Sequence, residues 1–131
     1  MKSSPYSEIT NQIRVSVRPK AIKKDSDPVG GVYAFGYTVK IENLGSETVQ
    51  LLERHWVVKS AEVQIAEVVG PGVVGEQPVL EAGQIFEYTS GAVLNDPFGC
   101  MEGSYTFRAD GGNFFQVRIP RFELLYPVVF H

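Results

Sequence analysis

The sequence predicts an all-β fold in a single domain, residues 1–131. Apolar and polar residues alternate along most of the chain, which is the period-two pattern of half-buried strands. Nine of the thirteen glycines lie between Gly70 and Gly112, which favours short strands and tight turns over a long helix. The 131 residues fit one domain at roughly 100–200 residues per domain. A content of 44% hydrophobic and 21% charged residues is typical of a folded globular protein.

The first two expected strands show the alternation clearly. Ile13, Val15 and Val17 alternate with polar residues over 12–18, and we expect Pro19 to end this strand. A polar loop follows, and then a strand over 33–42. One face of that second strand carries the large apolar side chains Tyr33, Phe35, Tyr37, Val39 and Ile41.

Residues 46–69 are ambiguous, because they contain neither Gly nor Pro and include good helix formers. A helix is one interpretation. We prefer two strands, over about 48–59 and 62–69, because β-branched residues are concentrated there. The alternation slips at Leu51-Leu52, which indicates a β-bulge that redirects the side chains after it.

Further strands are expected over about 84–90, 103–109 and 113–119. Asp110-Gly111-Gly112 joins the last two strands as a short hairpin turn. About seven or eight strands at spacings of roughly 8–15 residues, each with alternating faces, predict two antiparallel sheets packed face to face. The expected architecture is therefore an immunoglobulin-like or fibronectin type III-like β-sandwich.

Charge and cysteine usage exclude several classes of function. The net charge is −3, so the overall positive charge that drives nucleic-acid binding is missing. Residues 1–24 hold half of the basic residues and one acidic residue, which is typical of a solvated basic strand edge. Cys100 is the only cysteine, and no signal-peptide or membrane-spanning pattern is present. We expect a soluble cytoplasmic protein that binds neither nucleic acid nor membrane.

The run Gly70-Pro71-Gly72-Val73-Val74-Gly75 formally matches the dinucleotide fingerprint G-x-G-x-x-G. The residues after it do not fit, because Pro78 leaves no length for the helix that would hold a pyrophosphate. Glu76 would repel phosphate, and the loop contains no Lys or Arg. We interpret the run as a loop with unusual backbone angles that joins the two sheets. Val73 and Val74 either tuck into the core or are presented to a partner.

The sequence shows no constellation of catalytic or metal-binding residues. His55 lacks an activated nucleophile, and Cys100 is expected to pack as a small hydrophobe. Two distant histidines and one cysteine do not have the spacing of a zinc site. Trp56 is expected between the two sheets, with His55 pointing to the opposite face of its strand. The sequence therefore predicts no enzyme activity, no cofactor and no metal.

Several long motifs in one order resemble the ApaG family. They are, in chain order, FGYTVKIENLG at 35–45, Arg54-His55-Trp56, GPGVVGEQP at 70–78, EYTSG at 87–91, GCMEGSY at 99–105, and Ile119-Pro120 through His131. The resemblance covers nearly the whole chain. Residues 60–66 replace a more typical Asp/Asn-Gly turn, and Cys100 stands where small polar residues are common, which argues against a family role for its thiol.

The resemblance implies a single fibronectin type III-like sandwich of bacterial cytoplasmic proteins with no established enzymatic activity. Similar domains in eukaryotic F-box proteins and in a polymerase-interacting protein look like protein-binding modules. The family takes its name from proximity to a diadenosine tetraphosphate hydrolase gene. It has also been associated with cobalt and magnesium efflux phenotypes.

Two functions remain open on these grounds. One is a non-enzymatic protein-interaction module that uses the Gly70–Pro78 loop and its neighbours. The other is binding of a nucleotide or polyphosphate, with or without a divalent cation, on the Gly70–Gly75 loop. The oligomeric state stays open. The candidate binding residues are Arg54, His55, Gly70, Gly72, Val73, Val74, Gly75 and Glu76.

Overall fold

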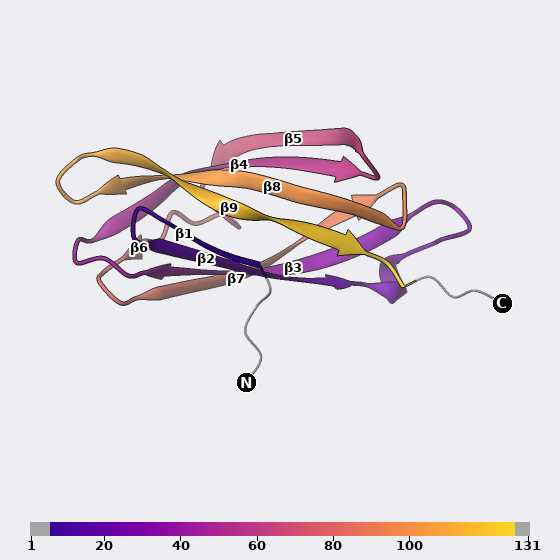
Figure 1. Cartoon of the computed structure of the whole chain (residues 1–131), viewed down its shortest axis with the longest axis horizontal. Helices are drawn as coiled ribbons and strands as arrows, with labels where there is room; N and C mark the ends of the chain where they lie inside the picture. Colours follow the sequence, from indigo (N-terminus) through magenta and orange to yellow (C-terminus); the bar gives the residue numbers. More distant parts are fainter. Residues whose placement is uncertain (1–5, 128–131) are drawn as a thin grey trace.

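Two antiparallel β-sheets pack face to face in the structure, a computed structural model that describes residues 6–127. One sheet has the strand order β1-β2-β3-β7, and the other has the order β5-β4-β8-β9 with β6 paired to β4 (Figure 1). The strands are β1 (Tyr6–Thr10), β2 (Ile13–Ala21), β3 (Tyr33–Asn43), β4 (Val49–Ser60), β5 (Val63–Pro71), β6 (Val79–Leu80), β7 (Ile85–Leu94), β8 (Phe98–Ala109) and β9 (Phe114–Leu125). The predicted all-β sandwich is confirmed. No helix within residues 6–127 is long and apolar enough to cross a membrane.

The described residues form nine strands, and the two shortest are hard to detect by periodicity. β1 has five residues and β6 has two, which is too few to establish an alternation. β1 pairs with β2 across a tight turn at Asn11 and Gln12, both of which have positive φ. β6 pairs with β4 at Val49 and Gln50.

Residues 46–69 contain strands and no helix, as the β-branched residues predicted. β4 and β5 form a hairpin closed by Ala61 and Glu62. Ala61 has a φ of 53°, a conformation that Asn or Gly adopts with less strain. The bulge is also confirmed, because the pairing of β4 with β8 shifts register between Leu51 and Glu53.

Several expected boundaries were wrong. The strand expected over 84–90 continues to Leu94, the one expected over 103–109 begins at Phe98, and the one expected over 113–119 continues to Leu125. Pro19 also does not end its strand. β2 continues to Ala21, which lies opposite Phe35 of β3. Pro19 lies opposite Tyr37 of β3. Within residues 6–127, β2 pairs at this position with β3 alone, and proline is tolerated where a strand is not paired on both sides.

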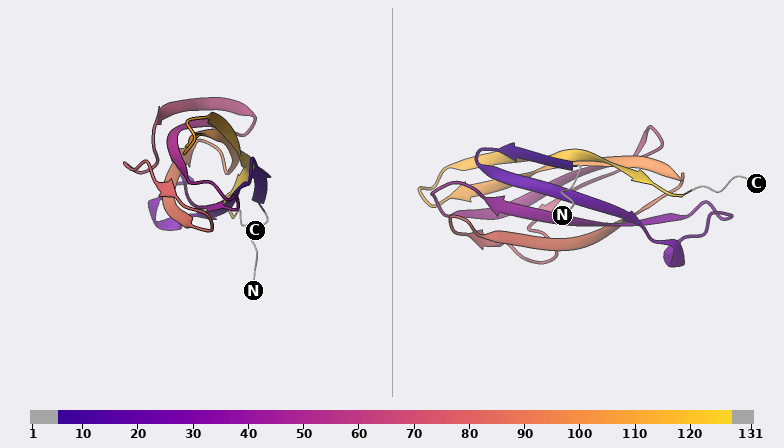
Figure 2. Two further views of the ribbon diagram at one scale, coloured as in Figure 1. Left: turned by 90° about the vertical axis from the view of Figure 1, so that its left-hand side faces the viewer. Right: turned by 60° about the horizontal axis from the view of Figure 1, so that its bottom comes forward.

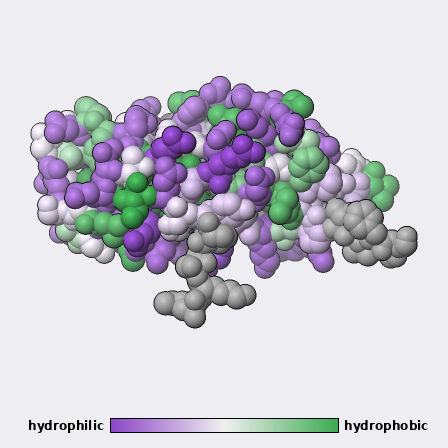
Figure 3. All heavy atoms as spheres, in the orientation of Figure 1, coloured by the Kyte–Doolittle hydropathy of each residue, from purple (hydrophilic) through white to green (hydrophobic). Residues whose placement is uncertain are grey.

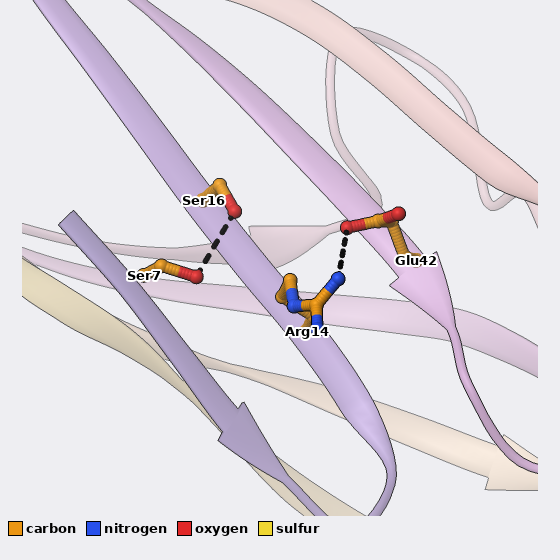
Figure 4. Close-up of polar contacts among 4 residues, drawn as sticks. All are labelled: Ser7, Arg14, Ser16 and Glu42. Carbon is orange, nitrogen blue, oxygen red and sulfur yellow. Dashed lines mark hydrogen bonds and ion pairs between the residues drawn. The ribbon is translucent and has the colours of Figure 1, made fainter. Parts of the chain in front are cut away.

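The outer face of the β1-β2-β3-β7 sheet is polar. The Ser7 and Ser16 hydroxyls hydrogen-bond at 3.2 Å between β1 and β2 (Figure 4). Arg14 Nη1 donates to Glu42 Oε2 at 3.2 Å between β2 and β3, as Figure 4 also shows. Other basic residues near the start of the chain are exposed, namely Arg18, Lys20, Lys23 and Lys24. This face is therefore solvated, as the charge pattern predicted.

The core lies between the sheets, and Trp56 is near its centre. The indole is 4% exposed, and its ring centroid lies 5.4 Å from that of Tyr37 in the opposite sheet. The Phe122 ring, on β9, lies 5.9 Å from it. The predicted place of Trp56 is confirmed. The largest fully buried side chains are Tyr105, Phe35, Phe107, Phe122, Ile13, Ile41, Leu51, Leu94 and Leu124.

The two long sides of the sandwich differ. On one side, which we call the closed side, β1 and β2 lie against β9. In the end-on view of Figure 2 (left), β1 lies beside β9 on this side. The other side, which we call the open side, consists of β5, β7 and the 72–78 loop, and it holds a cleft. The face of the molecule drawn in Figure 3 is mostly hydrophilic, with hydrophobic side chains in separate small groups.

Candidate functional site

The bulge in β4 turns a charged side chain toward the interior. Val49 and Leu51 point into the core, and a regular alternation would place Glu53 and His55 there too. The register shift after Leu51 moves the inward positions to Arg54, Trp56 and Val58 instead. Arg54 therefore stands on the inner face of β4, where the bulge indicated by the sequence has placed it.

Arg54 lines a cleft of about 430 Å³ on the open side. A volume of roughly 300–1,000 Å³ is usual for a small-molecule site. The cleft is bounded by β4, β5, β7 and the 72–75 segment, and Arg54 is the one charged residue among its lining residues. Most of the wall is apolar, and it includes Val58, Ile65, Val68, Val73, Val74 and Val93.

Two carbonyl groups hold the Arg54 guanidinium in place. Its Nη1 atom donates to the Pro71 oxygen at 2.8 Å and to the Gly72 oxygen at 3.1 Å. The guanidinium also passes close to Gly70, where an added Cβ would lie 3.2 Å from Nη1. Arg54 forms no ion pair with any side chain in residues 6–127. The cleft therefore contains a fixed cation without a counter-charge.

Hydroxyl groups make up the rest of the polar lining. Tyr37, Tyr88 and Ser90 line the cleft, and the Tyr88 hydroxyl hydrogen-bonds to the hydroxyl of Tyr105 in the opposite sheet. Burial raises the pKa of Tyr37, Tyr88 and Tyr105 above the ordinary tyrosine value of 10.0. These hydroxyls therefore stay protonated at neutral pH and can donate hydrogen bonds. The positive charge of Arg54 acts against this rise in all three pKa values.

The 72–78 loop is folded by its own backbone. Val73 and Glu76 exchange two hydrogen bonds, with N to O distances of 2.8 and 2.9 Å. Val74 and Gly75 form the tip between them, with φ values of 43° and 80°. Gly72 has a φ of 62°, and a Cβ there would lie 2.2 Å from the Glu76 oxygen. The predicted unusual backbone angles are confirmed. The prediction that this loop joins the two sheets was wrong, because it connects β5 to β6, which both pair with β4 in the same sheet.

The two valines of the loop differ in their burial. Val73 is 1% exposed and belongs to the core, whereas Val74 is 53% exposed at the tip. The carbonyl group of Leu52, the bulge residue, anchors the loop by accepting from Gly72 N at 2.8 Å and from Gln77 Nε2 at 2.9 Å. The bulge therefore positions both Arg54 and the loop beside it.

The loop does not have the form of a phosphate cradle. Such a cradle directs several unpaired backbone N–H groups at the anion. Here the amides of Gly72, Val73 and Glu76 already donate to carbonyl groups of the protein. The Glu76 side chain adds a negative charge at the same turn. The dinucleotide interpretation therefore gains no support from the geometry.

Six of the eight candidate residues come together at the cleft. Arg54, Val73, Val74 and Gly75 line it. Gly70 and Gly72 lie against the Arg54 guanidinium and the loop backbone. His55 points to the opposite face of β4, where its Nε2 atom lies 2.6 Å from Glu67 Oε2. Glu76 is exposed and does not line the cleft.

Sequence reasoning missed the hydroxyl groups of the cleft. Tyr37 and Tyr88 were expected only as core residues, because a core tyrosine and a cleft tyrosine occupy the same positions in a strand. Whether a cleft reaches them depends on the separation of β5 from β7, for which a strand pattern carries no signal. Cys100 is buried as expected, and burial raises the pKa of its thiol. Residues 6–127 contain no group of three or more His, Cys, Asp or Glu side chains that could hold a metal ion.

Comparison with known proteins agrees with the resemblance noted in the sequence. The ApaG domain, as a family model, matches residues 23–109. The chain is 52% identical over 122 residues to Protein ApaG of Rhodospirillum centenum, which covers 93% of this chain and 94% of that protein. It is 49% identical over 120 residues to Protein ApaG of Thiobacillus denitrificans, with coverage of 92% and 94%.

Solved structures show the same relationship. A crystal structure from Bordetella pertussis, described as that of an ApaA protein, superposes with a TM-score of 0.86 at 41% identity, over 98% of this chain and all of that chain. A second X-ray structure superposes with a TM-score of 0.84 at 40% identity, over 92% of each chain. On these matches in sequence and in fold, the chain belongs to the ApaG family.

Proposed function

We propose that this protein is a non-enzymatic module that binds another protein through the free edge of β5 and the Val74 tip beside it. The observation that carries the proposal is the state of β5. Within residues 6–127, this nine-residue strand pairs with β4 alone. Its exposed apolar residues are Val63, Ile65, Val68 and Val69.

An uncovered strand edge of this kind is unusual in a monomer, because it offers unpaired N–H and C=O groups to other chains. Natural edges are protected by charges, prolines, bulges or a covering segment. β9, at the other end of the same sheet, has Arg118, Pro120 and Arg121 and is covered by β1 and β2. β5 has a proline only at its last position, Pro71, and one register shift against β4, at Ile65. Its one charged residue, Glu67, is engaged by His55. The edge of β5 is therefore suited to accept an extended segment of a partner as an additional strand.

The resemblance to protein-binding domains supports the same role. A link to cobalt and magnesium efflux would then act through the bound partner. A cytoplasmic location belongs to this proposal, and the buried free thiol of Cys100 is compatible with a reducing compartment.

The alternative function, nucleotide or polyphosphate binding on the Gly70–Gly75 loop, predicts a different result in an NMR titration. Because the amides of Gly72, Val73 and Glu76 are already paired, millimolar ATP or diadenosine tetraphosphate, with or without magnesium or cobalt, should leave the NMR signals of these three amides unshifted. A saturable shift of these amides would favour that alternative over the protein-binding proposal.

The proposal can be tested by site-specific photo-crosslinking in cells. A crosslinking amino acid at Val69 on β5 is compared with the same amino acid at Phe114 on β9, and the two residues are 68% and 67% exposed. We expect a discrete adduct with another protein from position 69 and not from position 114. Val69→Lys should abolish capture of that partner, whereas the matched Phe114→Lys variant should retain it. Equal adducts from both positions, or adducts with a second copy of this chain alone, would contradict the proposal.

A further inference from the structure

The cleft on the open side has a chemistry of its own, separate from the strand edge. One cation, Arg54, lies in a wall that is otherwise apolar or hydroxyl-bearing. A ligand that matches this lining has one negative charge, because one guanidinium can offset only one. A polyphosphate would bring several negative charges into the cleft, and Arg54 could offset only one of them. Charge complementarity therefore favours a monoanion with an apolar body.

The Arg54 guanidinium is already held in position before an anion binds. Its Nη1 atom is fixed by the Pro71 and Gly72 carbonyl oxygens at 2.8 and 3.1 Å. The Nε and Nη2 atoms donate no hydrogen bond to residues 6–127. These are the atoms of one edge of the planar fork, whose geometry matches the two oxygens of a carboxylate. A side chain that is already immobilised loses little entropy when it binds.

The other residues of the cleft supply hydroxyl groups and an apolar surface for the rest of the ligand. Tyr37 and Ser90 provide hydroxyl groups beside the cation, and the walls from β5, β7 and the loop tip are apolar. The pKa values of Tyr37 and Tyr88 are raised by burial, so neither hydroxyl is a competing anion at neutral pH. An apolar group of the ligand would displace water from Val68, Val74 and Val93.

We infer that this cleft binds a monocarboxylate with an apolar body, its carboxylate on Arg54 and its apolar part between β5 and β7. The same chemistry has two sources, a small organic acid or the C-terminal carboxylate of a peptide that ends in an apolar residue. The inference does not depend on strand addition at β5, because Val69 does not line the cleft.

The binding test uses paired acids and amides on the full chain. Phenylacetate is compared with phenylacetamide, and the peptide acetyl-Gly-Val-Phe with its C-terminal amide. Trp56, the only tryptophan, lines the cleft and reports binding through its fluorescence, with calorimetry as an independent measurement. We expect each acid to bind at least about tenfold more tightly than its amide, because the amide loses the charge-assisted pair with Arg54. Tighter binding of the peptide acid would identify a protein C-terminus as the source, and tighter binding of phenylacetate would identify a small acid.

Variants then assign the effect to the guanidinium. Arg54→Gln should lower the affinity for the acids about tenfold or more and leave that for the amides unchanged. Gly70→Ala should lower it as well, since the new Cβ would lie 3.2 Å from Nη1 and displace the fork. Arg118→Gln is the matched control, an exposed arginine of the closed side, and should leave the affinity unchanged.

Three results would overturn the inference, namely no saturable signal at millimolar ligand, equal binding of acid and amide, or equal affinity of the Arg54→Gln and Arg118→Gln variants. The comparison of acid with amide on the unmodified protein stands even if Arg54→Gln fails to fold. Val69→Lys should leave acid binding intact, so failure of the cleft and failure of the strand edge are distinguishable.

Discussion

The closed and open sides of the sandwich are held together by different means. On the closed side, the β1-β2 hairpin folds over β9, and side chains of the hairpin hydrogen-bond to the β9 backbone. Asn11 Nδ2 donates to the Gln116 oxygen at 3.0 Å, and the Arg118 amide donates to Thr10 Oγ1 at 3.3 Å. On the open side, pairs of buried side chains link the two sheets. They include the Tyr88 and Tyr105 hydroxyl pair and the neighbouring rings of Tyr37 and Trp56.

This difference shows how one side can remain available for binding. On the closed side, the facing strand edges are covered, because β1 and β2 lie against β9. A side held by a few buried side chains keeps both a strand edge and a cleft, at the cost of depending on those side chains for stability. Substitutions on the open side should therefore be costly when they affect the buried links, and nearly neutral when they affect the exposed residues around them.

The largest effect is expected for Trp56→Ala. The indole contacts Tyr37 across the sandwich and is 4% exposed, so its loss should reduce the free energy of unfolding by about 3–5 kcal/mol. Urea unfolding followed by circular dichroism measures this. His55→Ala, on the outer face of the same strand, is the control and should cost less than about 1 kcal/mol. The wild-type fluorescence should be blue-shifted and poorly quenched by acrylamide. A Trp56→Ala protein as stable as wild type would show that Trp56 does not hold the two sheets together on the open side.

The second effect concerns the loop and compares two of its glycines. At Gly72 an alanine Cβ would lie 2.2 Å from the Glu76 oxygen, whereas at Gly75 no atom lies within 4 Å. Gly72→Ala should therefore cost about 3 kcal/mol, and Gly75→Ala about 1 kcal/mol for the positive φ alone. Urea unfolding gives both values. Because a displaced loop also withdraws Val73 from the core, only the Gly72→Ala protein should show shifted core signals in its NMR spectrum. Equal costs for the two variants would mean that the loop adjusts freely.

The third effect is a loss of stability at high pH. Burial raises the pKa of Tyr88 and Tyr105 above the ordinary 10.0, so above pH 10 the unfolded chain releases protons that the native state keeps. Stability should hold below that pH and fall as the pH rises further, by up to about 1.4 kcal/mol per pH unit for each such group. Tyr88→Phe should make this slope shallower and, by leaving Tyr105 without its partner, cost about 1–2 kcal/mol at pH 7. Urea titrations between about pH 8 and pH 11 test both points, and an unchanged slope in the variant would contradict this explanation.

Much of this fold follows from local patterns. The alternation over Tyr33–Asn43 and the β-branched residues of β4 and β5 predict their strands, because burying one face of a sheet imposes period two. The end of β2 was missed because tolerance of Pro19 depends on how neighbouring strands pair with β2, which the pattern of one strand does not show. β6 was missed for a different reason, since its two residues are too few to show an alternation.

Part of the candidate site was likewise predicted from the sequence, and part of it was not. Arg54 and the loop were identified from the sequence, and the slip at Leu51-Leu52 indicated the bulge that turns Arg54 inward. The cleft itself was not foreseen, since it arises from the distance between two strands, β5 and β7, that do not pair with each other. The burial of Val73 and the exposure of Val74 likewise depend on the hydrogen bonds of a turn, which the sequence pattern does not show.

The smallest effect is expected on the closed side, for Arg118→Gln. Arg118 Nε lies 3.3 Å from Glu8 Oε2, and the two side chains are 74% and 38% exposed. Solvent screens such a pair, so its loss should change the free energy of unfolding by about 0.5 kcal/mol or less. A double-mutant cycle with Glu8→Gln in urea, at low and at high salt, isolates the coupling, which salt should reduce further. The hydrogen bonds between the Asn11 and Thr10 side chains and the β9 backbone remain in the variant, so β1 should stay in place. A cost above about 2 kcal/mol would show that this ion pair closes the side, and the contrast between closure by a hairpin and closure by buried side chains would no longer hold.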